Sequence, residues 1–376
     1  MSIGLNHDHT SRNLTALWHS LEQGLTLPAE WYTDPLIFAQ EKTQIFRHAW
    51  QYVGLLEQVS TPGSFFTCTL AGVPLIITCD EDCNLHALVN VCRHRGAEVV
   101  RQECGQRASL QCHYHGWTYN LKGELYAAPG MKYEEGFDKT QFTLQSVQIA
   151  SWGPFLFATL DKEAAPLTHT LGALPELLLA TGVNLNGLKH RVRQTYEVQA
   201  NWKIVVDNYL ECYHCPIAHP SFSALIDTNN YTVTEYEFFS TQGGPQKVNA
   251  HPDKAPKFNK SGVVTDGFFA YLWPNFTLNL YPGPGSLSLN LFLPLAVNKT
   301  LAIFDYLFAD EVSQSDQEHF DQFIDQVQQE DIVLCESVQR GLDSGYFEQG
   351  KLMLRHEKAL RHFQKLVYQS VHKALL

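Results

Sequence analysis

The sequence predicts an α+β protein in which a small all-β domain is inserted into a larger domain of antiparallel sheet and helices. Two observations predict this class. Between residues 51 and 160, short β-rich runs alternate with turn residues such as TPG, AG and KGE, which is typical of a small all-β domain. On either side, helical periodicity alternates with longer strand-like runs. We therefore expect an N-terminal helical part of the larger domain over 1–50, the β domain over 51–160 and the rest of the larger domain over 161–376.

The elements follow from local patterns in chain order. Leu17, Trp18 and Leu21 recur near helical spacing, and residues 34–50 form a second candidate helix with one apolar side. In the β domain, apolar runs between breakers predict strands at 64–70, 73–78, 85–91, 109–114, 117–121 and 153–160.

The larger domain resumes with a strand-like run and then a helical pattern. Residues 191–202 predict a strand and 201–215 a helix, and further strands are predicted at 269–274, 276–282, 287–295 and 299–308. A long amphipathic helix follows, beginning at Ser313 or Ser315. Ser315 precedes Glu318 by three residues, which is the spacing of a capping box, and Gly341 is the predicted end.

Composition excludes several classes of protein. The chain has 376 residues, of which 44% are hydrophobic, so disorder and fibrous repeats are excluded. With 27 basic against 39 acidic residues the formal charge is −12, which argues against a nucleic-acid or anionic membrane partner. No run reaches the ~18–20 apolar residues of a membrane helix, and the polar N-terminus lacks a secretory pattern. We expect a cytoplasmic location, where the nine cysteines favour metal or catalytic roles over disulfides.

The first candidate site lies in the β domain, where two short pairs of metal-binding side chains occur in loops. Cys92 and His94 form one pair, and Cys112 and His115 form the other. Two thiolates and two imidazoles can bind one Zn²⁺ ion, or a Rieske [2Fe–2S] cluster in which two histidines replace two cysteines on one iron. A third interpretation is that these residues bind nothing. A tight turn at Gly116 and a packed Trp117 fit the cluster best, because a zinc finger ends on a helical histidine pair.

The second candidate site lies in the segment NWKIVVDNYLECYHCPIAHP. On a helix, Glu211 and His214 share a face because they are three residues apart. His214 and His219 are five apart and would be splayed, but Pro216 predicts that the helix ends or bends between them, which lets His219 fold back. Two histidines and one carboxylate with open positions form the facial triad of non-haem Fe(II) oxygenases.

Two questions about this second site stay open at the level of spacing. Cys212 and Cys215 form a C-x-x-C pair, which also suits zinc or redox chemistry. The carboxylate ligand is not identified by spacing. The late helix offers five candidates, most of which we expect on its solvated face: Asp316, Asp321, Asp325, Glu330 and Asp331.

These motifs together resemble one family. C-x-H followed by C-x-x-H-G-W, and N-W-K-x-x-x-D-N-Y-x-E-C-Y-H-C-x-x-x-H-P, resemble the α subunits of Rieske non-haem iron oxygenases in the ring-hydroxylating oxygenase superfamily. The resemblance extends from about residue 28 to 350. E-C-Y-H-C and the late E-S-V-Q-R-G-L are most similar to carnitine monooxygenase and the related choline, betaine and stachydrine oxygenases.

The resemblance implies two metal cofactors and the residues that bind them. Cys92 and Cys112 would bind one iron of a [2Fe–2S] cluster, and His94 and His115 the other. His214, His219 and Asp331 would bind a mononuclear Fe(II). Arg93 departs from the family, which often has Pro there, so only the local shape of that loop is in question.

Three more residues near the second site are candidates for function, Glu211 by the resemblance and Asp207 and Asn208 by their position in the sequence. Glu211 would bridge a cluster histidine to an iron histidine, in a place where many relatives have Asp. Asp207 and Asn208 lie close to the site in sequence, and Asp207 can either orient a histidine or lie as an acid on the helix face.

The activity implied is that of an oxygenase component that uses O₂ and electrons from an NAD(P)H-dependent flavin and iron–sulfur reductase, in a homotrimer. A quaternary or tertiary amine would be hydroxylated, with N-dealkylation or C–N cleavage. Such a cation suits aromatic faces, for which Tyr271, Trp273, Phe276 and Tyr281 are candidates if they are not simply core. The alternatives are an aromatic ring or aromatic acid as substrate, and a Rieske electron-transfer protein without oxygenase activity.

Overall fold

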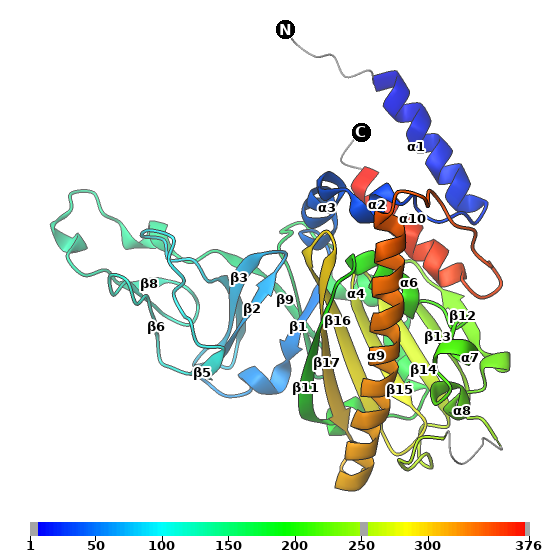
Figure 1. Ribbon diagram of the computed structural model, residues 1–376. Coiled ribbons are helices and arrows are strands. Elements are labelled where there is room, and N and C mark those ends of the chain that lie inside the picture. The colour runs from blue at the N-terminus through cyan, green and yellow to red at the C-terminus, as the bar shows by residue number, and fades with distance from the viewer. Residues whose placement is uncertain (1–6, 249–254, 373–376) are drawn as a thin grey trace. The chain divides into compact units, whose positions relative to one another are not determined.

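The computed structural model describes residues 7–248 and 255–372, without the side chains of residues 7–14. Figure 1 shows its elements. The chain forms two compact units. The inserted unit is Phe46–Leu167, somewhat longer than the predicted 51–160, and the host unit joins the segments before and after it, Met1–Ile45 and Thr168–Leu376. The predicted α+β class with an all-β insertion is confirmed.

The inserted unit is built on antiparallel strands. Its larger sheet has the spatial order β1 (Gln51–Leu55), β10 (Phe155–Thr159), β9 (Ser146–Trp152), β4 (Leu85–Val89), β3 (Val73–Cys79), β2 (Ser64–Leu70) and β5 (Cys104–Gln106). A smaller sheet contains β6 (Leu110–Gln111), β7 (Thr118–Tyr119) and β8 (Leu125–Ala127). The predicted strands 109–114 and 117–121 are thus shorter than expected, because Cys112–Trp117 forms a turn between them.

The core of the inserted unit lies directly beneath the candidate cluster residues. Phe65, Ile76 and Leu88 project from the larger sheet into one buried cluster that also contains Cys92 and Cys112. The two cysteines are therefore fixed by the hydrophobic core, since close packing leaves them little freedom to move.

The host unit is organised around a seven-stranded antiparallel sheet. Its spatial order is β11 (Lys189–Val198), β17 (Lys299–Phe308), β16 (Ser286–Ala296), β15 (Phe276–Tyr281), β14 (Asp266–Leu272), β13 (Phe239–Pro245) and β12 (Thr232–Glu235). Every residue of β15 is buried, so both faces are covered. Phe276, Leu278 and Leu280 alternate with Thr277, Asn279 and Tyr281, so one face is apolar and the other is a buried polar face.

Helices cover the sheet of the host unit and join its segments. Within the described residues they are α1 (His7–Glu22), α2 (Glu30–Thr33), α3 (Pro35–Glu41), α4 (Leu167–Leu171), α5 (Leu174–Leu179), α6 (Trp202–Tyr209), α7 (Cys215–Ala218), α8 (Phe222–Leu225), α9 (Gln314–Asp343) and α10 (Lys358–His372). A π-helical turn spans Lys42–Phe46, and 3-10 turns span Leu56–Val59, Met131–Tyr133, Lys139–Phe142, Leu185–Gly187 and Thr228–Asn230.

The long helix α9 crosses the sheet, as Figure 1 shows in orange, and it contacts α6 and β11. Of the two predicted starts, Ser313 is confirmed as the N-cap, because its hydroxyl accepts from the backbone N–H of Asp316 at 3.1 Å, and the capping box at Ser315 is wrong. The helix also continues past Gly341 to Asp343, since a single glycine costs a helix only about 1 kcal/mol.

The two ends of the chain complete the host unit. The fully buried Glu41 of α3 forms an ion pair with Lys203 Nζ at 2.6 Å and accepts a hydrogen bond from Trp202 Nε1 at 2.8 Å. From the other end, Gln364 of α10 accepts from the backbone N–H of Leu27 at 2.8 Å. The sequence reading did not predict α10, although Phe363, Val367 and Val371 mark its buried side at helical spacing.

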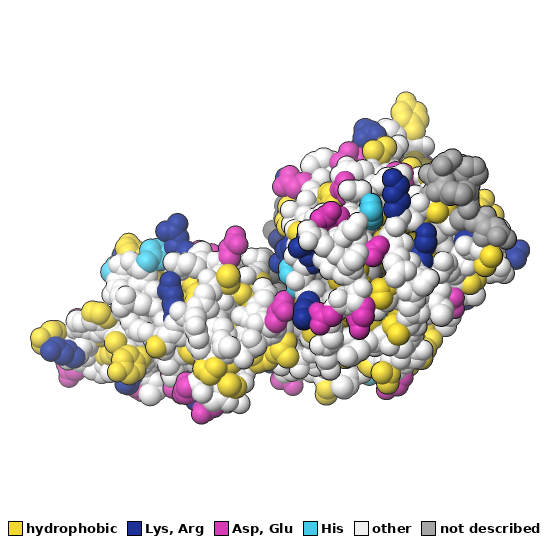
Figure 2. All heavy atoms as spheres, turned by 90° about the horizontal axis from the view of Figure 1, so that it is seen from below, with side chains coloured by type: hydrophobic (Ala, Val, Ile, Leu, Met, Phe, Trp, Pro, Cys, Tyr) yellow, Lys and Arg dark blue, Asp and Glu magenta, His cyan; other side chains and the backbone are white. Residues whose placement is uncertain are grey.

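The surface carries charges of both signs. On the face seen in Figure 2, acidic and basic side chains are interspersed among neutral ones. Through the described part of the chain, every helix is too short or too polar to cross a membrane.

Candidate metal centres

The first candidate centre is formed by two loops of nearly identical build. In one, the N–H of Gly96 donates to the carbonyl of Cys92 at 3.0 Å. In the other, Gly116 donates to Cys112 at 3.1 Å. Gly96 and Gly116 have φ values of +76° and +70°, which residues with a side chain rarely adopt, so the glycine is required for each loop to close.

The four predicted side chains of this centre are brought together, with the two residue types in different environments. Cys92 and Cys112 are 3% and 2% exposed, whereas His94 and His115 are exposed. The Nδ1 atoms of the two histidines lie 3.2 Å apart, and burial together with the neighbouring Cys92 raises the pKa of the Cys112 thiol. This donor set fits a [2Fe–2S] cluster whose cysteine-bound iron is buried and whose histidine-bound iron lies at the surface.

Aromatic packing fixes the orientation of the exposed histidines. The His94 ring stacks on Trp117 with centroids 4.9 Å apart and an interplanar angle of 11°. Trp117 is itself held edge-on by Phe137 and Phe142 at 5.8 and 5.6 Å. The glycine and tryptophan that follow His115 in sequence therefore do what the motif predicted: one closes the loop and the other positions a ring.

The second candidate centre begins where α6 ends. The predicted helix over 201–215 is wrong in extent, because α6 stops at Tyr209 and residues 210–214 form a turn. Glu211 and His214 meet through that turn rather than along a helix face. Pro216 begins a helix instead of ending one, since it occupies the first turn of α7, where its missing N–H costs nothing. His214 and His219 are the residues at the two ends of α7.

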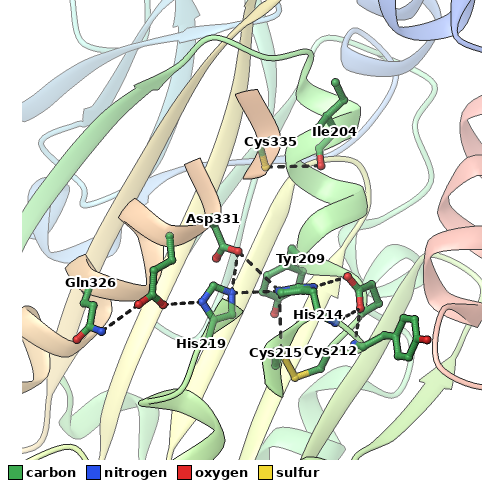
Figure 3. A network of polar contacts seen from close by, with 12 residues as sticks. Ile204, Tyr209, Cys212, His214, Cys215, His219, Gln326, Asp331 and Cys335 are labelled. Atoms are coloured by element: carbon green, nitrogen blue, oxygen red, sulfur yellow. Dashed lines mark hydrogen bonds and ion pairs between the residues drawn. A yellow bond between two sulfur atoms is a disulfide. The ribbon is translucent and has the colours of Figure 1, made fainter. Parts of the chain in front are cut away.

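The predicted triad is compact. His214 Nε2 lies 3.1 Å from His219 Nε2, and Asp331 Oδ1 lies 2.9 Å from His219 Nε2 and 3.7 Å from His214 Nε2. Figure 3 shows the three side chains converging, with Asp331 supplied by α9. Two metal–ligand bonds of about 2.1 Å at a right angle place their donor atoms about 3.0 Å apart, so the spacing fits one metal ion bound on three neighbouring positions.

A carboxylate holds each histidine of the triad on the side away from the metal position. Glu211 Oε1 accepts from His214 Nδ1, and Glu330 Oε2 accepts from His219 Nδ1 at 2.7 Å. Each contact fixes the tautomer that leaves Nε2 free as a ligand. Burial lowers the pKa of His219, but Asp331 and Glu330 outweigh burial and raise it overall.

Within the described residues, the hydrogen bonds of Asp207 go to a tyrosine and a glutamine rather than to a histidine, and its side chain is not a solvated acid on the helix face. Its Oδ2 accepts from Tyr32 Oη at 2.7 Å and from Gln364 Nε2 at 3.0 Å, so it joins both ends of the chain to α6. Burial raises the pKa of Asp207 to about 7 against the lowering effect of these hydrogen bonds. Asn208, by contrast, lines the cavity described below.

Cys212 and Cys215 form a disulfide, contrary to the expectation that cysteines serve metal or catalytic chemistry in preference to disulfides. The bridge spans the turn that carries His214, and both of its residues line the cavity. A zinc role for this pair is excluded while the bridge is closed, because a metal ligand must be a free thiolate.

A cavity of about 90 Å³ adjoins the triad. Its wall is rich in aromatic side chains, of which four form a connected cluster: Phe222, Tyr231, Phe269 and Tyr281. Of the four aromatic residues proposed from the sequence, Tyr281 lines this cavity. Tyr271 and Trp273 instead pack against Phe363 in the core, and Phe276 is buried on the opposite, apolar face of β15.

Sequence reasoning missed the role of Glu330 and most of the cavity wall. Glu330 is one of the five acids of α9 named as candidates for the carboxylate ligand, but in the structure it accepts a hydrogen bond from His219 Nδ1. The signal in the sequence was that a second carboxylate, Glu330, stands beside Asp331, since metal-binding histidines usually donate to a carboxylate. Phe222, Tyr231 and Phe269 carry no distinctive spacing, because separate elements bring them together.

Comparison with known proteins gives the following. Residues 49–147 match the family "Rieske [2Fe-2S] domain", and residues 185–372 match "Ring hydroxylating alpha subunit (catalytic domain)". The chain is 34% identical over 366 residues to the chloroplastic choline monooxygenase of Arabidopsis thaliana, covering 93% of this chain and 84% of that protein. It is 33% identical over 355 residues to the carnitine monooxygenase oxygenase subunit of Acinetobacter baumannii, covering 92% and 94%.

A solved structure shows the same similarity in three dimensions. A quaternary ammonium Rieske monooxygenase, described in terms of carnitine oxidation and inter-subunit electron transfer, superposes with a TM-score of 0.84. The two chains are 30% identical, and the match covers 94% of this chain and 97% of that one.

Proposed function

The chain belongs to the Rieske-type ring-hydroxylating oxygenase α subunits, and from this premise we propose that it is an oxygenase component that hydroxylates a small quaternary or tertiary amine. Hydroxylation of a C–H bond next to nitrogen consumes O₂, two electrons and two protons and releases water. The resulting carbinol then loses the hydroxylated carbon as a carbonyl compound, which completes N-dealkylation or C–N cleavage.

Two cofactors are implied by the family, a [2Fe–2S] cluster and a mononuclear iron, and the donor sets fit both. Cys92, Cys112, His94 and His115 would hold the cluster, and His214, His219 and Asp331 the single iron. When bound, these groups supply single-electron storage and O₂ activation. The chain's own contribution is to orient the ligands through Glu211 and Glu330 and to shape the cavity beside them.

The observation that carries the substrate assignment is the aromatic cavity adjoining the triad. Its cluster of Phe222, Tyr231, Phe269 and Tyr281 presents ring faces and edges to a small space. An ammonium ion is attracted to aromatic faces, and this attraction is stronger where water is excluded. None of the described residues that line the cavity is Lys or Arg, so no basic side chain there opposes a cationic substrate.

The proposed assembly follows from the need to pass electrons from a cluster to the triad. A single protomer places its cluster residues and its triad in separate compact units. We place the chain in a homotrimer in which Glu211 bridges His214 to a cluster histidine of the neighbouring subunit, served by an NAD(P)H-dependent flavin and iron–sulfur reductase. Support comes from the relative described as having inter-subunit electron transfer, and from the exposure of His94 and His115. A cytoplasmic location stays a prediction.

A single-turnover experiment tests the function. The protein, purified anaerobically with its iron and reduced chemically, is mixed with O₂ and one of a panel of trimethylammonium compounds or aromatic acids, and products are identified by mass spectrometry. We expect a dealkylated or hydroxylated amine. Product from an aromatic acid alone would favour the alternative of ring oxidation at the same metal sites, and an intact cluster without Fe(II) binding would favour a simple electron carrier.

A further inference from the structure

A sulfur atom lies beside the metal-binding nitrogen of His214. Cys215 Sγ is 3.9 Å from His214 Nε2, the ring atom that the contact of Nδ1 with Glu211 leaves free for a metal. This sulfur is bonded to Cys212 Sγ, and both cysteines belong to the wall of the cavity beside the triad (Figure 3). A sulfur in a disulfide is not a thiolate, so in this form Cys215 does not compete for the metal.

The position of Cys215 suits a fourth ligand of a tetrahedral ion. Zn–S and Zn–N bonds of about 2.3 and 2.1 Å that meet at a tetrahedral angle place sulfur and nitrogen about 3.6 Å apart, close to the 3.9 Å between Cys215 Sγ and His214 Nε2. His219 Nε2 and Asp331 Oδ1 are the other two donors. Once the bond to Cys212 is broken, the Cys215 side chain is free to turn about its Cα–Cβ bond and approach the ion.

A fourth protein ligand changes which metal the site prefers. Two histidines and one carboxylate leave positions open, which suits a catalytic ion. A soft thiolate added to these three gives four protein donors, as in the closed sites that hold structural Zn²⁺. Cys335 lines the same cavity, but its Sγ is directed to the backbone carbonyl of Ile204 at 4.0 Å. Cys215 is therefore the sulfur that the structure places at the metal position.

We propose that the Cys212–Cys215 bond keeps the triad open, and that its reduction makes Cys215 a fourth ligand that closes the site around Zn²⁺. A dithiol reductant supplies two electrons and two protons, so the bridge becomes two thiols and the reductant becomes a disulfide. Zn²⁺ then displaces the proton of the Cys215 thiol. This inference rests on the part of the proposed function that places a metal in the triad, and it holds for any substrate.

The test compares zinc coordination in the two redox forms of the full chain. The mononuclear iron is removed with a chelator under argon, the cluster is retained, and an equimolar amount of Zn²⁺ is added. One portion is first treated with a water-soluble phosphine, which takes oxygen from water and leaves two thiols in place of the bridge. Alkylation and mass spectrometry count these thiols. X-ray absorption at the zinc edge distinguishes Zn–S bonds of about 2.3 Å from Zn–N and Zn–O bonds of about 2.0–2.2 Å.

We expect sulfur among the zinc ligands of the reduced protein and none in the oxidised protein. Competition with a chelator should show that Zn²⁺ binds at least about 10-fold more tightly after reduction, because loss of a partner that merely supports a ligand already costs about 10- to 100-fold in metal affinity. The visible absorption of the cluster should be the same in both forms, because the cluster residues lie in the other unit.

Two matched variants identify the sulfur. Cys212→Ser and Cys215→Ser both remove the bridge, but only Cys212→Ser leaves a thiol beside His214. Cys212→Ser should show the Zn–S bond without any reductant, and Cys215→Ser should show none even with it. If the phosphine does not reach the bridge, Cys212→Ser supplies the free thiol. If a variant fails to fold, the two redox forms of the unaltered protein decide the matter.

The outcomes separate this inference from the proposed function. A zinc site of nitrogen and oxygen alone, in protein whose two new thiols have been counted, overturns the inference. A Zn–S bond in Cys215→Ser overturns it too, because the sulfur then comes from another cysteine. Neither result affects the triad as a metal site. Failure of Zn²⁺ to bind in either redox form contradicts the triad itself, and with it the proposed function.

Discussion

The two candidate metal centres are built in opposite ways. The cluster ligands come from two similar loops of one continuous unit, and His94 and His115 are only 21 residues apart. The triad joins both ends of a one-turn helix to α9, and His219 and Asp331 are 112 residues apart. The first centre depends on local loop geometry, whereas the second depends on the whole host unit being assembled.

This difference explains how much the sequence could predict. All four candidate cluster residues stand out by their spacing, because Gly96 and Gly116 make each loop nearly self-contained. At the triad, His214 and His219 were recognisable, but spacing alone could not choose Asp331 among five acids, and only the family resemblance did so. Glu330 and the aromatic wall lay beyond sequence reasoning, since tertiary contacts define them.

The largest expected effect is the loss of the cluster while the mononuclear iron stays bound. Cys112→Ser should abolish the cluster, because a serine hydroxyl is a poor ligand for a soft iron–sulfur centre. The mononuclear iron should remain bound, because its ligands lie in the other unit. Visible absorption and iron content per chain report the two centres separately, and loss of all the iron from both centres would contradict their independence.

The converse change, Asp331→Ala, should eliminate turnover and leave the cluster spectrum intact. It removes one of three ligands, so Fe(II) is held by two histidines only. Asp343→Ala, near the end of the same helix, serves as a control and should retain full activity. A cluster spectrum altered by Asp331→Ala would show that the two centres are not separate.

A smaller effect is expected from Glu330→Gln. The amide oxygen can still accept from His219 Nδ1 at reduced strength, so Fe(II) affinity should fall about 10- to 100-fold without loss of the fold. Competition with a chelator measures the affinity. Gln326→Ala removes only the donor that supports Glu330 at 2.9 Å and should weaken Fe(II) binding less. An unchanged affinity in Glu330→Gln would refute the positioning role.

The smallest effect concerns the stability of the host unit. The folded-state pKa of Asp207 is about 7, above the ordinary value of about 3.9, so the folded protein holds this proton more tightly than the unfolded chain. The contribution of Asp207 to stability therefore falls between about pH 4 and pH 7, by at most about 1.4 kcal/mol per pH unit, and is constant above that window.

Asp207→Asn should remove the pH-dependent contribution of this side chain to stability, because the amide does not titrate. Urea unfolding at pH 5 and pH 8 measures it, and the loss of stability between the two pH values should be smaller in the variant than in the unaltered protein. The same loss in both proteins would mean that Asp207 ionises normally.

The buried contact of Glu41 with Lys203 and Trp202 has a consequence for the order in which the protein forms on the ribosome. Glu41 and Trp202 are 161 residues apart, so at a synthesis rate of about 5–20 residues per second Trp202 is added roughly 8–30 s after Glu41. Gln364, which is 337 residues after Leu27, is added roughly 20–70 s after it. The inserted unit is one continuous stretch, so its cluster-binding loops are complete while the host unit is still missing its second half.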